Sequence, residues 1–120
     1  EDLQAVLFTH LHVDHSVDFP AFIKAAFFTS RDTDLPVFGP DGNALMPATS
    51  EFVQDLLGPN GAYRYLSEYV TPGEPAAFHV RSVDVPLRQG SIWRSDLGEG
   101  LNISAIPVHH GPIAALGWRV

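Results

Sequence analysis

Residues 5–20, AVLFTHLHVDHSVDFP, join a short apolar run to a cluster of histidines and then to the start of a helix. The run Ala5–Thr9 predicts a buried strand that leads into a loop. After the cluster, Asp18 and Pro20 are typical of a helix start, and apolar residues at helical spacing predict a helix over residues 19–28. The cluster therefore lies between a strand end and a helix start, where α/β folds commonly place their functional sites.

The cluster contains His10, His12, Asp14 and His15, so half of the six histidines of the chain fall within six positions. In a turning loop, His10 and His12 can direct their imidazoles to one side, while Asp14 and His15 reach a second point nearby. Neutral imidazoles suit zinc, and a carboxylate adds tolerance for manganese or iron. The histidines could also merely solvate the loop or cap the next helix, but the strand before them and the helix after them favour metal binding.

Composition limits the other functions that the chain can have. With 120 residues, 45% hydrophobic and 18% charged, it is expected to form one domain, residues 1–120, around one modest core. It has no cysteine, so His, Asp and Glu are the available metal ligands. Its net charge of −7 counts against a broad nucleic-acid groove and favours a small substrate over RNA. No apolar run approaches the roughly 18 to 20 residues of a membrane span, so no membrane partner is expected, and nothing indicates a cellular compartment.

Hydrophobic periodicity and turn residues predict further elements along the chain. The predicted helices are residues 43–57 and a short helix over residues 60–69, followed by a loop at residues 71–75. The predicted strands are residues 35–40, 77–85, 91–95, 101–108 and 114–120, of which the last two are close enough to pair as a hairpin. Tyr63, Tyr65 and Tyr69 have the spacing of one packed or half-buried helix face, which we favour over a substrate pocket.

Four segments carry a resemblance to a known family. THLHVDH (Thr9–His15) resembles the signature of the metallo-β-lactamase superfamily and matches it at all four ligand positions. The continuation SVDFP (Ser16–Pro20) resembles the Ser/Thr-x-x-hydrophobic-Pro sequence of the tRNase Z-like (ribonuclease Z-like) branch. LPVFGPDG (Leu35–Gly42) and IPVHHGPIAALGWRV (Ile106–Val120) are similar to further segments of that branch, with Trp118 in place of the family's tyrosine.

The resemblance implies an α/β (α+β) fold, the four-layer αββα sandwich of the superfamily. It also implies that the chain is the central portion of such a domain, with the N- and C-terminal parts absent. The family's bridging aspartate and final histidine ligand would then follow Val120. Residues 43–100 carry little that is specific to the family.

The resemblance implies two metal sites as well. His10, His12 and His110 would hold the first divalent ion, and Asp14 and His15 the second. Zinc is the expected metal, with manganese or iron as alternatives.

Other candidate residues are given different roles. Gly111 lets the backbone turn sharply beside His110. His109 is expected to point to the opposite face and to face solvent or support the site. We interpret His79 as structural, and Asp84 and Asp96 as turn or surface carboxylates.

The function implied by the resemblance is that of a metal-dependent phosphodiesterase, in which a hydroxide that bridges the two metals attacks phosphorus. Asp14 would hold the second metal and orient the hydroxide. The same site could instead hydrolyse a lactone, a carboxylic ester or a sulfate ester, because a fold does not fix a substrate. A non-catalytic metal-binding domain is the alternative from another class.

Expectations about substrate and assembly are less specific. A small phosphate ester or other ester is the expected substrate, with RNA only by family analogy, and an oligomer is compatible with the sequence. The segment in isolation is expected to bind metal weakly and to show little activity.

Overall fold

The computed structural model describes residues 3–120, which form two three-stranded sheets and several helices. In chain order the elements are β1 (Val6–Leu7), α1 (Val13–Ser16), α2 (Phe19–Ala26), β2 (Leu35–Pro40), α3 (Thr49–Leu57), the 3-10 helix η1 (Arg64–Tyr69), β3 (Val80–Val85), β4 (Trp93–Asp96), β5 (Asn102–Pro107) and β6 (Leu116–Arg119). The mixed α/β class predicted from the sequence is confirmed.

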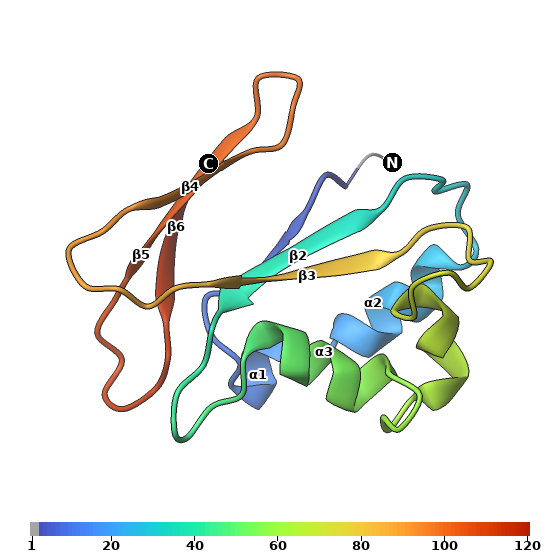
Figure 1. Cartoon of the computed structure of the whole chain (residues 1–120), viewed down its shortest axis with the longest axis horizontal. Coiled ribbons are helices and arrows are strands. Elements are labelled where there is room, and N and C mark those ends of the chain that lie inside the picture. The colour runs from blue at the N-terminus through green and yellow to red at the C-terminus, as the bar shows by residue number, and fades with distance from the viewer. Residues whose placement is uncertain (1–2) are drawn as a thin grey trace.

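The first sheet is parallel and has the order β1-β2-β3. The pairing of β2 with β3 aligns Leu35 with Val80 and continues to Pro40 opposite Val85. Parallel neighbours need long connections, and here each connection contains helices: α1 and α2 between β1 and β2, and α3 and η1 between β2 and β3 (Figure 1). The second sheet, β4-β5-β6, is antiparallel, and β5 and β6 form the hairpin that the sequence predicts.

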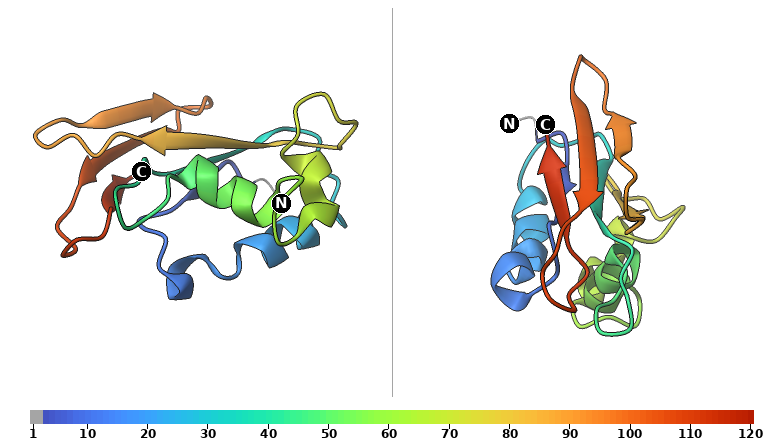
Figure 2. Two further views of the ribbon diagram at one scale, coloured as in Figure 1. Left: turned by 60° about the horizontal axis from the view of Figure 1, so that its bottom comes forward. Right: turned by 90° about the vertical axis from the view of Figure 1, so that its left-hand side faces the viewer.

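The two faces of the parallel sheet are buried in two separate cores. Leu35 and Val37 on β2 belong to the core beneath the helices, whereas Phe38 belongs to the core shared with the antiparallel sheet. This division follows from strand geometry, because successive side chains point to opposite faces. Figure 2 (left) shows helices on one side of β3 and the β4–β5 hairpin on the other. The layers are thus helices, parallel sheet and antiparallel sheet.

A fourth, helical layer on the far side of the antiparallel sheet does not occur among residues 3–120. The four-layer sandwich therefore stays a prediction. None of the helices in this part of the chain combines the length and the apolar character of a membrane span.

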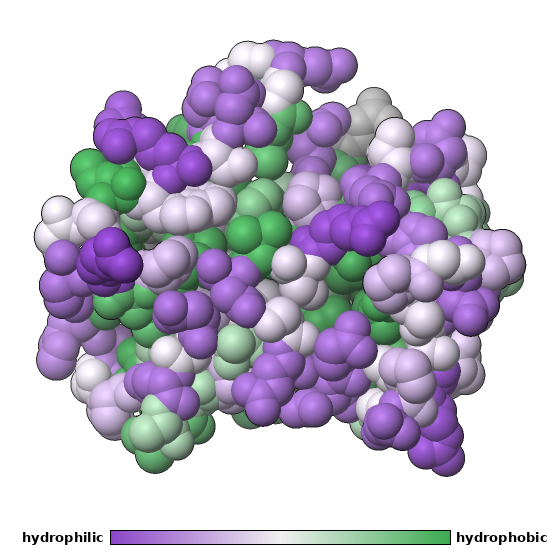
Figure 3. Space-filling view, in the orientation of Figure 1, coloured by the Kyte–Doolittle hydropathy of each residue, from purple (hydrophilic) through white to green (hydrophobic). Residues whose placement is uncertain are grey.

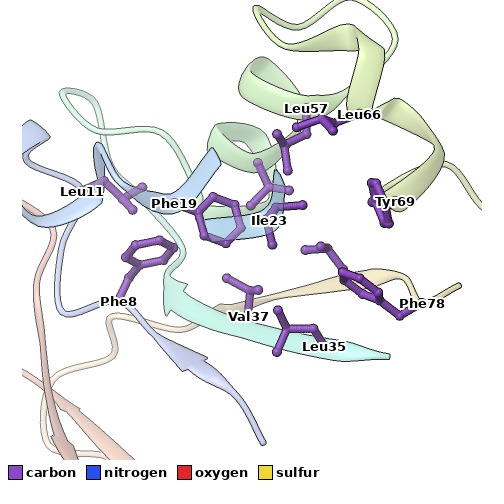
Figure 4. Close-up of a cluster of buried hydrophobic side chains, with 12 residues drawn as sticks. Phe8, Leu11, Phe19, Ile23, Leu35, Val37, Leu57, Leu66, Tyr69 and Phe78 are labelled. Atoms are coloured by element: carbon purple, nitrogen blue, oxygen red, sulfur yellow. The ribbon is translucent and has the colours of Figure 1, made fainter. Parts of the chain in front are cut away.

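The helix-side core anchors the segment that carries the histidines. Phe8 packs edge-on against Phe19 of α2 with ring centroids 5.4 Å apart, and Leu11 is buried in the same cluster (Figure 4). Ile23, at the centre of α2, is fully buried. Burial of one such side chain stabilises the fold by about 1.5–3 kcal/mol. The loop between β1 and α1 is therefore held on both sides of His10 by core residues.

The second core ties β6 to the end of β1. Trp118 packs against both Phe38 and Trp93, and its indole Nε1 donates a 2.9 Å hydrogen bond to the carbonyl of Phe8. The amide of Leu116 donates to the carbonyl of Thr9 at 2.8 Å.

On the face shown in Figure 3, hydrophilic residues predominate and hydrophobic ones show between them near the middle.

Two predicted helices differ from the structure in their start or their type. The predicted helix 43–57 is wrong at its start, because α3 begins only at Thr49. The side chain of Asn43 accepts hydrogen bonds from the amides of Leu45 and Met46, and this local turn competes with helix formation. The predicted helix over residues 60–69 is a 3-10 helix from Arg64 to Tyr69.

The tyrosines of that region do not share one packed face, contrary to the prediction. Tyr69 is buried and its ring lies 5.0 Å from that of Phe78. Tyr63 and Tyr65 are exposed. In a 3-10 helix, residues at i and i+3 align, so the spacing expected for an α-helical face does not apply.

Asp84 has a structural role that its sequence position did not reveal. It lies on β3, not in a turn, and it is partly buried. Its carboxylate accepts hydrogen bonds from the amide and the hydroxyl of Ser50, at 2.8 and 2.6 Å. Both donors lie in the first turn of α3, so a strand residue satisfies the start of this helix. Asp96, by contrast, accepts from the amide of Gly98, as the predicted turn carboxylate would.

Candidate metal centre

The segment after β1 passes from an extended backbone at His12, with φ −59° and ψ 146°, into the one-turn helix α1. His12 is the N-terminal flanking residue of α1, and its carbonyl accepts from the amide of His15 at 2.9 Å and from the hydroxyl of Ser16 at 3.0 Å. The prediction that these residues lie in a loop is confirmed for His10 and His12, whereas Asp14 and His15 lie on helix α1. The hydroxyl of Ser16 binds the carbonyl of His12, so it links α1 to the loop that carries the first two histidines.

His10 is the buried member of the cluster, with 7% of its surface exposed. Its Nδ1 lies 3.0 Å from the hydroxyl oxygen of Thr9, and its buried Nε2 has no hydrogen-bond partner among residues 3–120. A proton on Nδ1 that is shared with Thr9 leaves a lone pair on Nε2. A buried polar atom without a partner costs about 1–3 kcal/mol. A cation bound at Nε2 would supply the missing partner, so the donor set fits a metal ion.

His110 reaches the same point from the other sheet. It follows β5, and Gly111 next to it has φ +57°, the left-handed conformation that glycine adopts readily, as the predicted sharp turn requires. One ligand atom each from His10, His12 and His110 lie within 4.8 Å of one another. The ring centroid of His110 is 4.6 Å from that of His10 and 5.2 Å from that of His12. The fold therefore brings together the three histidines predicted for the first metal.

Asp14 and His15 lie beside this group without belonging to it. The ring centroid of His15 is 4.3 Å from that of His10. The Nε2 of His15 is 3.4 Å from a carboxylate oxygen of Asp14, and both side chains are at least half exposed. His109 is exposed and lies outside the group of three histidines. His79 lies elsewhere, with its Nε2 3.1 Å from the carbonyl oxygen of Glu74.

Burial and neighbouring charge act together on His10. Burial lowers the pKa of His10 most, and the nearby imidazoles of His15, His110 and His12 lower it further. Both causes disfavour the imidazolium form, because a charged ring would lose hydration and would be repelled by any other protonated ring. A neutral imidazole is the form that binds metal, so this environment keeps His10 ready as a ligand.

A pocket of about 340 Å³ opens next to the exposed pair. Asp14 and His15 form its polar side, and Phe19 and Phe22 are among the apolar residues that line the rest. A site of this kind can hold an apolar or aromatic group next to polar chemistry.

Sequence reasoning missed two hydroxyl groups that support the centre. Thr9 contacts Nδ1 of His10, and Ser16 binds the carbonyl of His12. Both residues lie within the quoted motif, and a hydroxyl residue directly before the first histidine was the available signal for Thr9. The roles of Thr9 and Ser16 depend on backbone geometry that the motif alone does not specify.

Comparison with known proteins finds similarity to ribonuclease Z. The chain is 32% identical over 123 residues to ribonuclease Z of Mycolicibacterium paratuberculosis and to that of Mycobacterium avium, an alignment that covers 98% of the chain and 40% of each relative. It is also 32% identical over 71 residues to ribonuclease Z of Listeria innocua, which covers 59% of the chain and 22% of that relative.

The chain thus spans about 40% of the length of the mycobacterial relatives that it matches. No family model matches the chain, and no solved structure matches it significantly. The similarity to ribonuclease Z extends over nearly the whole chain, including the histidine cluster and the hairpin that carries His110.

Proposed function

We propose that the protein is a metal-dependent phosphodiesterase of the ribonuclease Z-like type. The observation that carries this proposal is the buried Nε2 of His10, which lacks a hydrogen-bond partner in the described part of the chain and lies in a group with His12 and His110. An orphaned ring nitrogen among other imidazoles has a simple physical explanation as a metal ligand. The similarity to proteins named ribonuclease Z supports the same reading.

His10, His12 and His110 would hold the first divalent ion, and Asp14 and His15 would contribute to a second. Zinc suits the imidazole-rich set, with manganese or iron as alternatives for the site that includes a carboxylate. Bound divalent ions lower the pKa of water and polarise a phosphoryl oxygen.

Asp14 is the proposed catalytic residue of the chain. Its carboxylate is 75% exposed and faces the pocket, and it is close enough to His15 for the two side chains to act at one point. An ionised carboxylate accepts hydrogen bonds, so Asp14 can orient an attacking water molecule as well as bind a cation. His15, whose ring lies against that of His10, links this point to the buried histidines.

RNA is the substrate class that the named relatives support, and the pocket beside Asp14 offers apolar surface for part of such a substrate. The net charge of −7 opposes broad binding of a polyanion. Bound cations would offset this charge locally, so that the scissile phosphate is held mainly at the site itself. A short RNA or a small phosphodiester is therefore the first substrate to test.

The test is a substrate panel for the intact protein with zinc or manganese: a short RNA, a bis-aryl phosphate, an aryl sulfate and a lactone. The proposal expects cleavage of RNA and the bis-aryl phosphate, and loss of both activities when a chelator removes the metal. Cleavage of the lactone alone would contradict the phosphodiesterase assignment.

The His12→Ala variant tests whether the histidine group is catalytic. Partners that only support a ligand typically contribute 10–100-fold to activity, so removal of a ligand itself is expected to lower kcat by about 100-fold or more. His109→Ala, an exposed histidine of the same region, is the matched control and should retain activity. Unchanged activity in His12→Ala would contradict the proposal, and metal binding without turnover in the wild type would favour a non-catalytic metal-binding domain.

A further inference from the structure

The carbonyl of Phe8 lacks the partner that its sheet would normally provide. The amide of Phe8 donates to the carbonyl of Phe38 at 2.8 Å, which extends the parallel pairing of β1 with β2 by one residue. In a parallel ladder, the carbonyl of the same residue accepts from the residue two positions further along the partner strand. That residue is Pro40, which has no N–H group.

Trp118 provides the missing donor from the opposite sheet. Its Nε1 lies 2.9 Å from the carbonyl oxygen of Phe8, and this bond is partly buried. The indole packs against Phe38, at a ring distance of 6.3 Å, and against Trp93, at 6.0 Å. A buried carbonyl must be paired, so the indole N–H replaces the ladder bond that Pro40 cannot make.

This single hydrogen bond joins the two segments that carry the grouped histidines. Phe8 precedes Thr9 and His10 directly, whereas Trp118 lies on β6, whose hairpin with β5 carries His110. The neighbouring bond from the amide of Leu116 to the carbonyl of Thr9 adds a second link between the same segments. The distance from His10 to His110 therefore depends on how β6 is held against the end of β1.

We propose that Trp118 is a positioning residue for the metal centre: its indole N–H holds the backbone before His10 in register with the hairpin that carries His110. The inference rests on the proposed function, because it assigns Trp118 an effect on metal binding. A phenylalanine at this position would keep an aromatic ring but remove the donor. A tyrosine would not replace the donor either, because its O–H lies at the tip of the ring and not on the side where the indole N–H lies.

The first test measures zinc affinity of the intact protein by competition with a chelator. Trp118→Phe is expected to weaken zinc binding by about tenfold, the lower end of the range for groups that orient metal ligands. Trp93→Phe is the matched control, because Trp93 packs against Phe38 and Trp118 but donates no hydrogen bond to any residue among 3–120. Its zinc affinity should stay within about twofold of the wild type.

Pro40→Ala provides a rescue experiment. Alanine restores an N–H at residue 40, so the carbonyl of Phe8 regains a donor from β2 and no longer depends on the indole. The effect of Trp118→Phe on zinc affinity should therefore shrink in the Pro40→Ala background, as a double-mutant cycle measures. A purely packing role for Trp118 predicts the same loss in both backgrounds.

Hydrogen exchange of the indole N–H groups in the wild-type protein keeps the inference testable if Trp118→Phe does not fold. The Trp118 indole should exchange much more slowly than that of Trp93, and equal rates would overturn the inference. Equal zinc affinity of wild type and Trp118→Phe, or an equal loss in Trp93→Phe, would also overturn it. Absence of zinc binding by the wild type would overturn the proposed function and, with it, this inference.

Discussion

His10 has one ring nitrogen in a hydrogen bond and one that has no partner within residues 3–120. Thr9 contacts Nδ1, and the surrounding protein buries Nε2 among other imidazoles. Burial is also the largest cause of the lowered pKa of His10, because it disfavours the charged ring. Hydrogen bonding, burial and ionisation therefore all point to a neutral imidazole whose lone pair faces the site.

Asp34 offers a residue-scale test of electrostatics away from the metal centre. Its carboxylate accepts from Nε of Arg81 at 2.7 Å and from the amide of His79 at 2.9 Å. The hydrogen bond from Arg81 contributes most to lowering the pKa of Asp34, followed by the bond from His79. The resulting stabilisation is present above the unfolded-state pKa of about 3.9 and is lost as the pH falls through the lower folded-state pKa.

Asp34→Asn should therefore lower the free energy of unfolding at pH 7, by about 0.5 kcal/mol, because the pair is half exposed and screened by water. The difference from wild type should disappear at a pH below the folded-state pKa of Asp34, where the wild-type carboxyl is neutral as well. Urea unfolding at the two pH values measures this. Asp32→Asn, two residues away and outside the described ion pairs, is the control. A difference that is equal at both pH values would contradict the account.

Prediction of single residues from the sequence succeeds where chemistry is local and stops where it is tertiary. The motif around His10, His12, Asp14 and His15 indicates a metal centre because ligand types recur at close spacing. His110 could be selected only by its resemblance to a family segment, and the structure then places it beside His10. The bond from Trp118 to Phe8 had no sequence signal, because it depends on the pairing of β1 with β2 and on the placement of β6.

Helix α3 shows how one element depends on another. Its N-terminal flanking residue is Ala48, whose methyl side chain cannot cap the helix. Asp84 of β3 instead accepts hydrogen bonds from Ser50 in the first turn. An acidic side chain near a helix N-terminus also interacts favourably with the helix dipole. The strand thus stabilises the start of the helix that covers it.

Asp84→Ala should lower the free energy of unfolding by about 1 kcal/mol, as loss of a helix cap does. Chemical denaturation of the intact protein measures the effect, and Asp96→Ala, which removes a carboxylate that accepts from the amide of Gly98 in an exposed turn, should have a smaller one. Zinc affinity should be unchanged in both variants. A large loss of zinc affinity in Asp84→Ala would contradict the structural role of Asp84 and indicate a metal ligand.

At the scale of elements, predictions are most accurate where the pattern of apolar residues acts alone. The strand at residues 35–40 and the helix near residues 19–28 form close to their predicted bounds. The predicted helix over residues 43–57 began too early, because periodicity did not reveal that the Asn43 side chain binds the following amides. Strand β1 ends at Leu7 and not at the predicted Thr9, because Pro40 has no N–H to continue the ladder at the carbonyl of Phe8.

At the scale of the whole molecule, the histidine group forms where the two sheets meet. His10 and His12 come from the end of the parallel sheet, and His110 comes from the hairpin of the antiparallel sheet. Packing of Phe38 against Trp93 and Trp118 holds the sheets together behind the site. Metal binding should in turn stabilise this arrangement, because a cation that bridges both sheets binds the folded state alone.

Zinc affinity of the intact protein, measured by chelator competition for wild type, His110→Ala and His109→Ala, tests the proposed metal centre most directly. The two variants change neighbouring histidines, of which only His110 belongs to the group with His10 and His12. His110→Ala should weaken zinc binding by about 100-fold or more, and His109→Ala should leave it unchanged. Equal affinity in wild type and His110→Ala, or an equal loss in both variants, would contradict it.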